Sequence, residues 1–226
     1  MTCFDLPMPP SPSGPSPSRQ VHEGDALIWL AANPLPADAA IVTSLPDVSE
    51  FRHRDRERWR SWFVAAAASV LRATPPPTAA VFYQTDVKHD GRWIDKAFLV
   101  QTAAEAAGVP LLWHKIVCRA PAGQATGGRP GYVHLLCFSA QCRDHGTPTT
   151  ADVLPALGAM TWTRAMGLDA ARFAVAWLRD HAGARCIVDP FCGVGTALAV
   201  ANELGMSAIG VELNPGRAAK ARSLRL

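Results

Sequence analysis

Two carboxylates and two glycines near the end of the chain have the types and spacing that grip a nucleotide-like cofactor. Asp189 stands where a short apolar segment stops, and Glu212 ends the next apolar segment. Between them, Gly193 and Gly195 allow a tight turn whose backbone comes close to a ligand, because no Cβ stands in the way. A carboxylate at a strand end about twenty residues after such a turn accepts hydrogen bonds from both hydroxyls of a ribose. The pattern therefore predicts a ligand of this kind between Asp189 and Glu212.

A strand, a turn, a helix and a second strand are needed to position these groups. Residues 186–188 are predicted as the first strand, and Thr196 opens an apolar helix that Gly205 stops. Residues 208–211 are predicted as the second strand. The third glycine of the dinucleotide fingerprint G-x-G-x-x-G is absent, which disfavours an NAD pyrophosphate at the helix end.

Residues 189–196, Asp-Pro-Phe-Cys-Gly-Val-Gly-Thr, resemble the cofactor motif of class I S-adenosylmethionine-dependent methyltransferases, in particular the DNA amino-methyltransferases with Asp-Pro-Phe-x-Gly-x-Gly-Thr. The resemblance implies S-adenosylmethionine as cofactor, with its amino-acid portion on Asp189, its ribose on Glu212 and its adenine amino group on Asp25. A helix N-cap is the alternative role for these carboxylates, above all for Asp25. The cofactor-binding residues that we expect are Asp25, Asp189, Pro190, Phe191, Gly193, Gly195, Thr196 and Glu212.

The late position of this motif indicates a circularly permuted order. Residues 21–27 resemble the Gly-Asp segment that opens the permuted amino-methyltransferases, and residues 41–47 resemble their catalytic Thr-Ser-Pro-Pro-Tyr segment. Apolar periodicity predicts further strands at 39–43, 79–83, 110–117 and 132–139, and helices at 54–73, 95–107, 169–182 and after Asn214. We therefore expect one α/β domain over residues 21–226, with a Rossmann-like, doubly wound, mostly parallel seven-stranded sheet.

The segment Ser44-Leu45-Pro46-Asp47 corresponds to the catalytic loop of that family. There the first side chain and a proline carbonyl accept hydrogen bonds from the target amino group, and the terminal aromatic residue stacks on the flipped base. This chain keeps Ser44 and Pro46, but Leu45 replaces a proline and Asp47 replaces the aromatic residue. The acceptor chemistry is thus open between a base amino group and another group.

A carboxylate at position 47 suits a second chemistry. Asp47 near a lysine resembles the ribose 2′-O-methyltransferases, in which a lysine of lowered pKa deprotonates the hydroxyl. Lys115 is the candidate lysine, with Lys88 as a second, and an exposed strand-end position is the alternative for both. The catalytic residues that we expect are Ser44, Pro46, Asp47 and Lys115.

Arginines follow this segment between residues 52 and 60, and they suit either phosphate contact or a solvated helix face. Arg119 precedes a Gly/Pro-rich loop, 120–130, and Arg129 lies within it, on the same rim. The substrate-binding residues that we expect are Arg52, Arg54, Arg119 and Arg129.

Residues 140–161 form only a short connection where a sequence-specific DNA methyltransferase needs a region that reads base edges. We therefore expect RNA, a tRNA or rRNA, as the partner and substrate. DNA is the alternative, and an inactive cofactor-binding module that stabilises a partner is a third.

The composition limits which classes of function remain. The net charge of +3 permits a nucleic-acid partner without requiring one. Residues 1–20, rich in Pro, Ser and Gly, are predicted to form a disordered tail without a secretory signal, and no apolar run is long enough to span a membrane. Six cysteines without a C-x-x-C pair are typical of a reducing compartment, so we expect a cytoplasmic monomer or homodimer.

A zinc site built from His134-x-x-Cys137 and Cys142-x-x-His145 is disfavoured, and we expect no metal. His134 and Cys137 fall in a predicted strand, where side chains three residues apart point to opposite faces.

Overall fold

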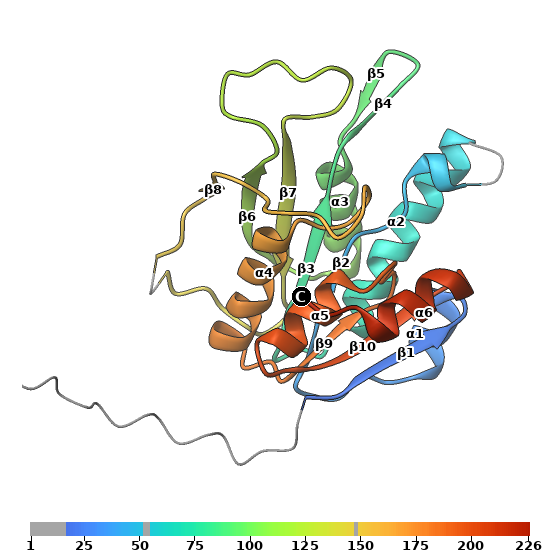
Figure 1. The fold of residues 1–226 in the computed structure, drawn as a ribbon, viewed down its shortest axis with the longest axis vertical. Coiled ribbons are helices and arrows are strands. Elements are labelled where there is room, and N and C mark those ends of the chain that lie inside the picture. Colours follow the sequence, from blue (N-terminus) through green and yellow to red (C-terminus); the bar gives the residue numbers. More distant parts are fainter. Residues whose placement is uncertain (1–16, 52–54, 147–148) are drawn as a thin grey trace, which may run out of the picture.

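The computed structural model describes residues 17–51, 55–146 and 149–226, and at its centre lies one large sheet covered by helices (Figure 1). The strands of this sheet are β1 (Arg19–Glu23), β2 (Ala39–Thr43), β3 (Ala80–Gln84), β6 (Leu111–Cys118), β7 (Tyr132–Phe138), β8 (Val153–Leu154), β9 (Cys186–Asp189) and β10 (Ser207–Glu212). Their spatial order is β1-β10-β9-β2-β3-β7-β6-β8. Among the described strands of this sheet only β7 runs antiparallel to both of its neighbours, so the predicted mostly parallel sheet is confirmed.

Helices cover both faces of the sheet. They are α1 (Ala26–Ala32), α2 (Arg56–Ala73), α3 (Lys96–Ala107), α4 (Leu168–His181), α5 (Thr196–Glu203) and α6 (Pro215–Ser223). The first three pack with one set of strand residues, such as Ile41 and Phe82, and the last three pack with the alternate set, such as Val42 and Val81. Successive strand residues point to opposite faces, so apolar side chains at both sets give the sheet a core on each side, as in a doubly wound fold.

The sheet has eight strands where seven were expected. The additional strand, β8, pairs with the edge strand β6, and the Ile116 amide donates to the Asp152 carbonyl beside it. β1 begins at Arg19, two residues inside the range predicted as a tail, because its backbone pairs with β10. Residues 1–16 of that range lie outside the described residues.

Three further elements were not predicted as separate units. They are α1, a 3₁₀ turn, η1 (Val48–Glu50), and a hairpin of β4 (Val87–His89) and β5 (Arg92–Ile94), which projects from the sheet beside the loop between β6 and β7 (Figure 1). Each is short, so apolar periodicity has too few residues to reveal it.

The chain leaves β2 and β9 in opposite directions across the sheet. β2 leads through α2 to β3, whereas β9 leads through α5 to β10, and α2 and α5 lie on opposite faces. The carboxyl ends of these two neighbouring strands therefore diverge, and such a switch point is where open α/β sheets bind ligands. The Thr43 hydroxyl donates to Asp189 at 2.7 Å across this point.

Among the described residues no helix is long and apolar enough to cross a membrane. The five described cysteines carry free thiols.

Candidate functional site

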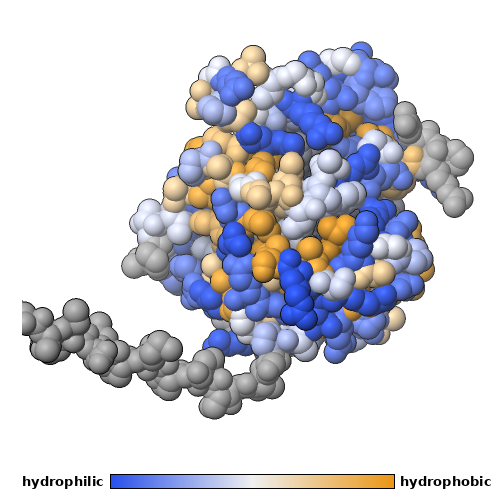
Figure 2. Space-filling view, viewed as in Figure 1, coloured by the Kyte–Doolittle hydropathy of each residue, from blue (hydrophilic) through white to orange (hydrophobic). Residues whose placement is uncertain are grey.

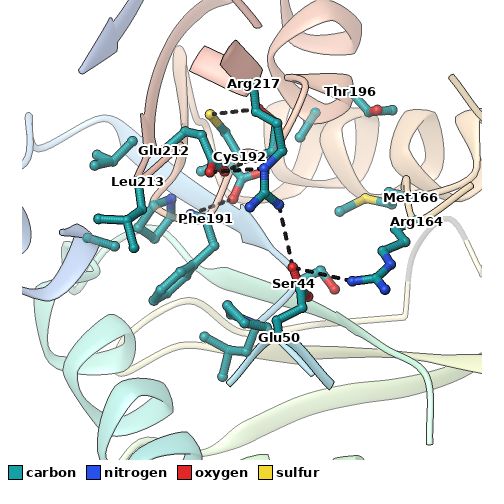
Figure 3. A pocket seen from close by; sticks show the side chains of 18 of the residues that line it. Ser44, Glu50, Arg164, Met166, Phe191, Cys192, Thr196, Glu212, Leu213 and Arg217 are labelled. Carbon is teal, nitrogen blue, oxygen red and sulfur yellow. Dashed lines mark hydrogen bonds and ion pairs between the residues drawn. The ribbon is translucent and has the colours of Figure 1, made fainter. Parts of the chain in front are cut away.

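A cavity of about 370 Å³ opens at the carboxyl ends of β2, β9 and β10. We call it the glycine-turn cavity, because the turn between β9 and α5 forms one wall (Figure 3). In the view of Figure 2, apolar residues gather at the middle of the corresponding face and polar residues border them. Seven of the eight residues expected to bind a cofactor line this cavity: Asp25, Asp189, Pro190, Phe191, Gly193, Thr196 and Glu212.

The eighth, Gly195, has a packing role. Its φ is +87°, and a Cβ there would lie 2.9 Å from the backbone and side chain of Ala221 in α6. Gly193, with a φ of +55°, points its amide into the site and donates to Glu212 at 3.0 Å. The two glycines thus let the chain turn and let α6 approach the turn closely.

Asp189 ends β9 inside the protein and is 4% exposed. It accepts hydrogen bonds from the Thr43 hydroxyl and from the Phe191 amide at 3.1 Å. Burial raises the pKa of Asp189 to about 7, and Glu212 nearby adds to the rise, although the two hydrogen bonds oppose it. A cationic ligand group beside Asp189 would therefore find a carboxylate that gains from being paired.

Glu212 ends the neighbouring strand, β10, and is 7% exposed. One of its oxygens accepts from Gly193 and the other from the Asn214 amide at 2.8 Å, and Arg217 lies 3.3 Å away. Oε2 has a single donor and keeps a lone pair for a ligand hydroxyl, whereas Oε1 already faces both Asn214 and Arg217. A carboxylate in this position suits a ribose hydroxyl.

Asp25 caps a helix, which is one of the two roles that the sequence left open, and it also borders the cavity. Its Oδ1 caps α1 by accepting from the Leu27 and Ile28 amides, and its residue lines the glycine-turn cavity. One carboxylate oxygen is thus occupied by the helix while the side chain is exposed at the cavity wall.

Phe191 and Thr196 complete the cavity wall from the two ends of the turn. Phe191 meets Trp62 of α2 edge-on, at 6.0 Å between ring centroids. The Thr196 hydroxyl lies 2.7 Å from that of Thr161. These contacts tie the turn to α2 on one face and to the segment before α4.

A second cavity of about 470 Å³ adjoins the first, and we call it the hairpin cavity because β4 forms part of its wall. Both cavities are lined by Ser44, Leu45, Glu50, Arg164 and Ala165. The segment that follows β2 therefore stands between them.

Ser44 lies at this junction, and within the described residues its hydroxyl has no hydrogen-bond partner. The carbonyl of Pro46 accepts from the indole of Trp59 in α2 at 3.1 Å, while Leu45 is buried. These contacts fix the segment and leave Ser44 free to meet a ligand.

Asp47 is paired with Lys96, a lysine that the sequence did not single out. The ammonium of Lys96, the first residue of α3, lies 3.8 Å from Asp47 Oδ2, and its side chain is only 5% exposed. Burial lowers the pKa of Lys96, against the opposing effect of Asp47, Asp86 and Glu50. Both partners line the hairpin cavity.

The expectation that Lys115 pairs with Asp47 is wrong. Lys115 points to the α4 face of the sheet, where its ammonium lies 3.1 Å from Asp152 and 5.7 Å from the centre of the Trp113 ring. It lines neither cavity. The reason is strand order, because β3 and β7 stand between β6 and β2. Lys88, the second candidate, does line the hairpin cavity.

Arg119 and Arg129 line the hairpin cavity, as expected for residues that contact a substrate. Arg52 and Arg54 lie outside the described residues. Two arginines that the sequence did not single out stand at the junction: Arg164 and Arg217 lie 3.7 and 3.4 Å from Glu50 Oε2 (Figure 3). No local sequence motif predicts these two ion pairs, because Glu50, Arg164 and Arg217 come from three separate segments.

The residues of the disfavoured zinc set do not form a group of ligands among the described residues. His134 binds Asp86 at 3.1 Å, whereas Cys137 is buried on the α4 face. Asp86, Asp95 and His134 do lie together, with ligand atoms within 4.8 Å. Asp95 caps α3, and Asp86 accepts several hydrogen bonds, so both carboxylates already serve the fold.

Comparisons with known proteins bear on this architecture. The sequence matches no protein-family model and no curated protein. A candidate DNA modification methylase from Thermus thermophilus, TTHA0409, is similar in structure, with a TM-score of 0.70 and 21% identity over 90% of this chain and 92% of the other. Another structure of that protein is complexed with S-adenosyl-L-methionine.

Two further structures are similar. PvuII DNA methyltransferase, cytosine-N4-specific, gives a TM-score of 0.72 at 16% identity over 92% of this chain and 87% of the other. The M1.HpyAVI–SAM complex gives 0.60 at 15% identity over 90% and 98%. The chain therefore has the fold of the class I S-adenosylmethionine-dependent methyltransferases, in the permuted order that the sequence predicts.

Proposed function

We propose that this chain is an S-adenosylmethionine-dependent methyltransferase that transfers a methyl group to an amino group of a base in DNA. The observation that carries the proposal is the meeting of two cavities at Ser44. One presents the carboxylates and glycine turn that suit the cofactor, and the other presents polar and cationic side chains that suit a nucleic-acid acceptor.

The residues of the glycine-turn cavity fit S-adenosylmethionine. Asp189 is placed to bind the ammonium of its amino-acid portion, Glu212 to bind the ribose hydroxyls and Asp25 to meet the adenine amino group. The bound cofactor supplies an activated methyl group on a sulfonium sulfur.

The residues at the junction suit an amino acceptor. The Ser44 hydroxyl can accept a hydrogen bond from the amino group and so orient its nitrogen lone pair towards the glycine-turn cavity. As the N–C bond forms and the C–S bond breaks, the nitrogen must lose a proton. Asp47, held by Lys96, is the nearby carboxylate that can accept it.

DNA replaces RNA as the preferred substrate. The RNA preference rested on the short connection over residues 140–161, and the comparisons do not support it, because the similar proteins whose names give a substrate act on DNA. The hairpin of β4 and β5 also supplies a projecting element that the sequence did not reveal. The ribose 2′-O alternative loses Lys115, which lies away from Asp47, but Lys96 stands beside Asp47 in its place, so ribose methylation is kept as an outcome of the test.

The test is transfer of labelled methyl from S-adenosylmethionine to DNA and to RNA, followed by mass spectrometry of the nucleosides. The proposal expects an N-methylated base in DNA. Ser44→Ala should lose most of the turnover while cofactor affinity is kept, and Ser69→Ala, on the surface of α2, is the matched control. Labelled methyl found only in RNA, or on ribose, would show that the acceptor is not an amino group of a DNA base. Cofactor binding without any transfer would favour an inactive partner module.

A further inference from the structure

The hairpin of β4 and β5 carries an aromatic side chain that is unusually exposed for its size. Trp93 is 46% exposed, although tryptophan is mostly buried in proteins. The hairpin projects next to the long loop between β6 and β7 (Figure 1), and its strand β4 lines the hairpin cavity. An exposed indole at such a place needs an explanation, because burying it would stabilise the fold.

Trp93 is held in one orientation although its ring is exposed. Its indole N–H donates to Asp86 Oδ2 at 3.2 Å. Ile94, the next residue, is buried in the core beneath the hairpin, so the backbone at this point is fixed as well. The ring therefore presents an exposed surface without losing much conformational entropy when something binds to it.

Trp93 is anchored by a buried carboxylate that also accepts hydrogen bonds from several other groups. Asp86 is 2% exposed and accepts from the Lys96 amide at 2.8 Å, the Tyr132 hydroxyl at 3.3 Å and His134 at 3.1 Å. Burial acts to raise the pKa of Asp86, but the hydrogen bonds from His134 and Lys96 outweigh it, and the pKa is lowered. Asp86 is thus an ionised acceptor that fixes its donors in place. His114 extends the network by contacting His134 at 2.9 Å.

Cationic residues come from the hairpin itself and from the neighbouring loop. Lys88 lies directly opposite Trp93 in the hairpin and lines the hairpin cavity. Arg92 precedes Trp93, and Arg119 and Arg129 line the same cavity from the neighbouring loop. A fixed aromatic face beside several cations is the combination that binds unstacked nucleobases together with their phosphates.

We infer that Trp93 is a stacking platform for an unstacked nucleobase of the bound DNA, with Lys88, Arg92, Arg119 and Arg129 contacting its phosphates. The choice of DNA rests on the proposed function. The platform lies outside the glycine-turn cavity and the junction at Ser44, so it contributes to substrate binding and not to cofactor binding. It also places an aromatic surface near an acceptor segment whose own terminal residue, Asp47, has none.

The experiment compares Trp93→Leu, Trp93→Phe and Phe98→Leu with the unchanged protein. Leucine keeps apolar bulk without an aromatic face, and phenylalanine keeps the face without the N–H. Phe98 is the matched control, because it is an exposed aromatic residue that lies on α3 and not on the hairpin. Binding of fluorescein-labelled single-stranded DNA is measured by anisotropy at fixed salt, S-adenosylmethionine affinity by calorimetry, and folding by the midpoint of thermal unfolding.

We expect Trp93→Leu to weaken DNA binding about tenfold, since stacking on one aromatic side chain contributes that much. Trp93→Phe should retain most of the affinity, and Phe98→Leu should retain all of it. Cofactor affinity should be unchanged in all three. Equal DNA affinity of Trp93→Leu and Phe98→Leu, or no DNA binding by the unchanged protein, overturns the inference.

Methyl transfer separates this inference from the proposed function. If Trp93→Leu loses DNA affinity and the unchanged protein transfers no methyl group, the platform stands and the methyltransferase proposal fails. If methyl is transferred to DNA and Trp93→Leu binds normally, the proposed function stands and the platform fails.

Discussion

The glycine-turn cavity and the hairpin cavity adjoin each other but are built in different ways. The first takes its carboxylates from the ends of two neighbouring strands, and the backbone amides of the following loops fix them. The second takes its charged groups from loops and helix ends that meet only in the folded chain, such as Asp47 and Lys96. The carboxylates and amides of the first cavity belong to one continuous segment of the chain. The charged groups of the second come from distant segments, so their arrangement depends on how the chain folds.

The two cavities also treat charge differently. Asp189 is buried without a cation in contact, so its ionised form is unfavourable until a ligand pairs it. Asp47 already has its cation, Lys96, and is 30% exposed on its side chain. Asp189 in the first cavity therefore gains from a positively charged ligand group, whereas Asp47 in the second already has a cation beside it. Four predictions test this contrast.

The largest effect concerns the pH dependence of stability without cofactor. The pKa of Asp189 is raised from 3.8 to about 7, so the folded state holds a proton that the unfolded state releases. This stabilisation is complete below about pH 4 and is lost as the pH rises to about 7, with a fall of about 4 kcal/mol. Urea unfolding between pH 4 and 8 measures it.

Asp189→Asn supplies the control for this prediction. Asparagine does not titrate, so the free energy of unfolding should lose this component of its pH dependence. Parallel curves for the two proteins would show that burial does not raise the pKa of Asp189.

The next effect concerns cofactor affinity. Glu212→Gln removes the charge that accepts the ribose hydroxyls, and we expect S-adenosylmethionine affinity to fall about 100-fold, as for the loss of charged hydrogen bonds. Glu23→Gln is the matched control, because Glu23 lies beside Glu212 in the sheet register but lines neither cavity. Calorimetry distinguishes them, and equal affinities would remove Glu212 from the site.

The third prediction concerns turnover. Lys96→Met and Asp47→Asn should each lower kcat about 30-fold, because the remaining partner of the ion pair is left without its counter-charge. Cofactor affinity should stay unchanged, since neither residue lines the glycine-turn cavity. Lys115→Met, at an equally buried lysine on the other face, should keep normal kcat. If Lys115→Met were the slow variant, the assignment of Lys96 would be refuted.

The smallest effect concerns the turn itself. Gly195→Ala and Gly205→Ala both place a side chain at positive φ, +87° and +77°, but only at Gly195 does the Cβ meet Ala221. Gly205→Ala should cost about 1 kcal/mol of stability. Gly195→Ala should cost about 1 kcal/mol more, from overpacking. Thermal unfolding of both variants gives the difference, which should vanish if α6 can shift freely.

Much of the fold could be predicted because its signals are local. The strand before Asp189, the helix from Thr196 and its stop at Gly205 were expected from periodicity and capping, and the structure confirms them. The hairpin and β8 could not be predicted in this way. They have two or three residues per strand, and their pairing depends on the neighbouring chain rather than on a pattern of their own.

The sequence by itself determined the glycine turn and the two carboxylates that border it, because strand, turn, helix and strand follow one another without interruption. Only the tertiary structure decided that Asp47 pairs with Lys96 and not with Lys115. Three strand spacings, about 14 Å, separate β6 from β2, and Lys115 points to the opposite face. The same holds for the anchoring of Trp93 on Asp86. Contacts between distant segments depend on the order of the strands and on the face of the sheet to which each side chain points. Neither can be predicted from the local spacing of residues.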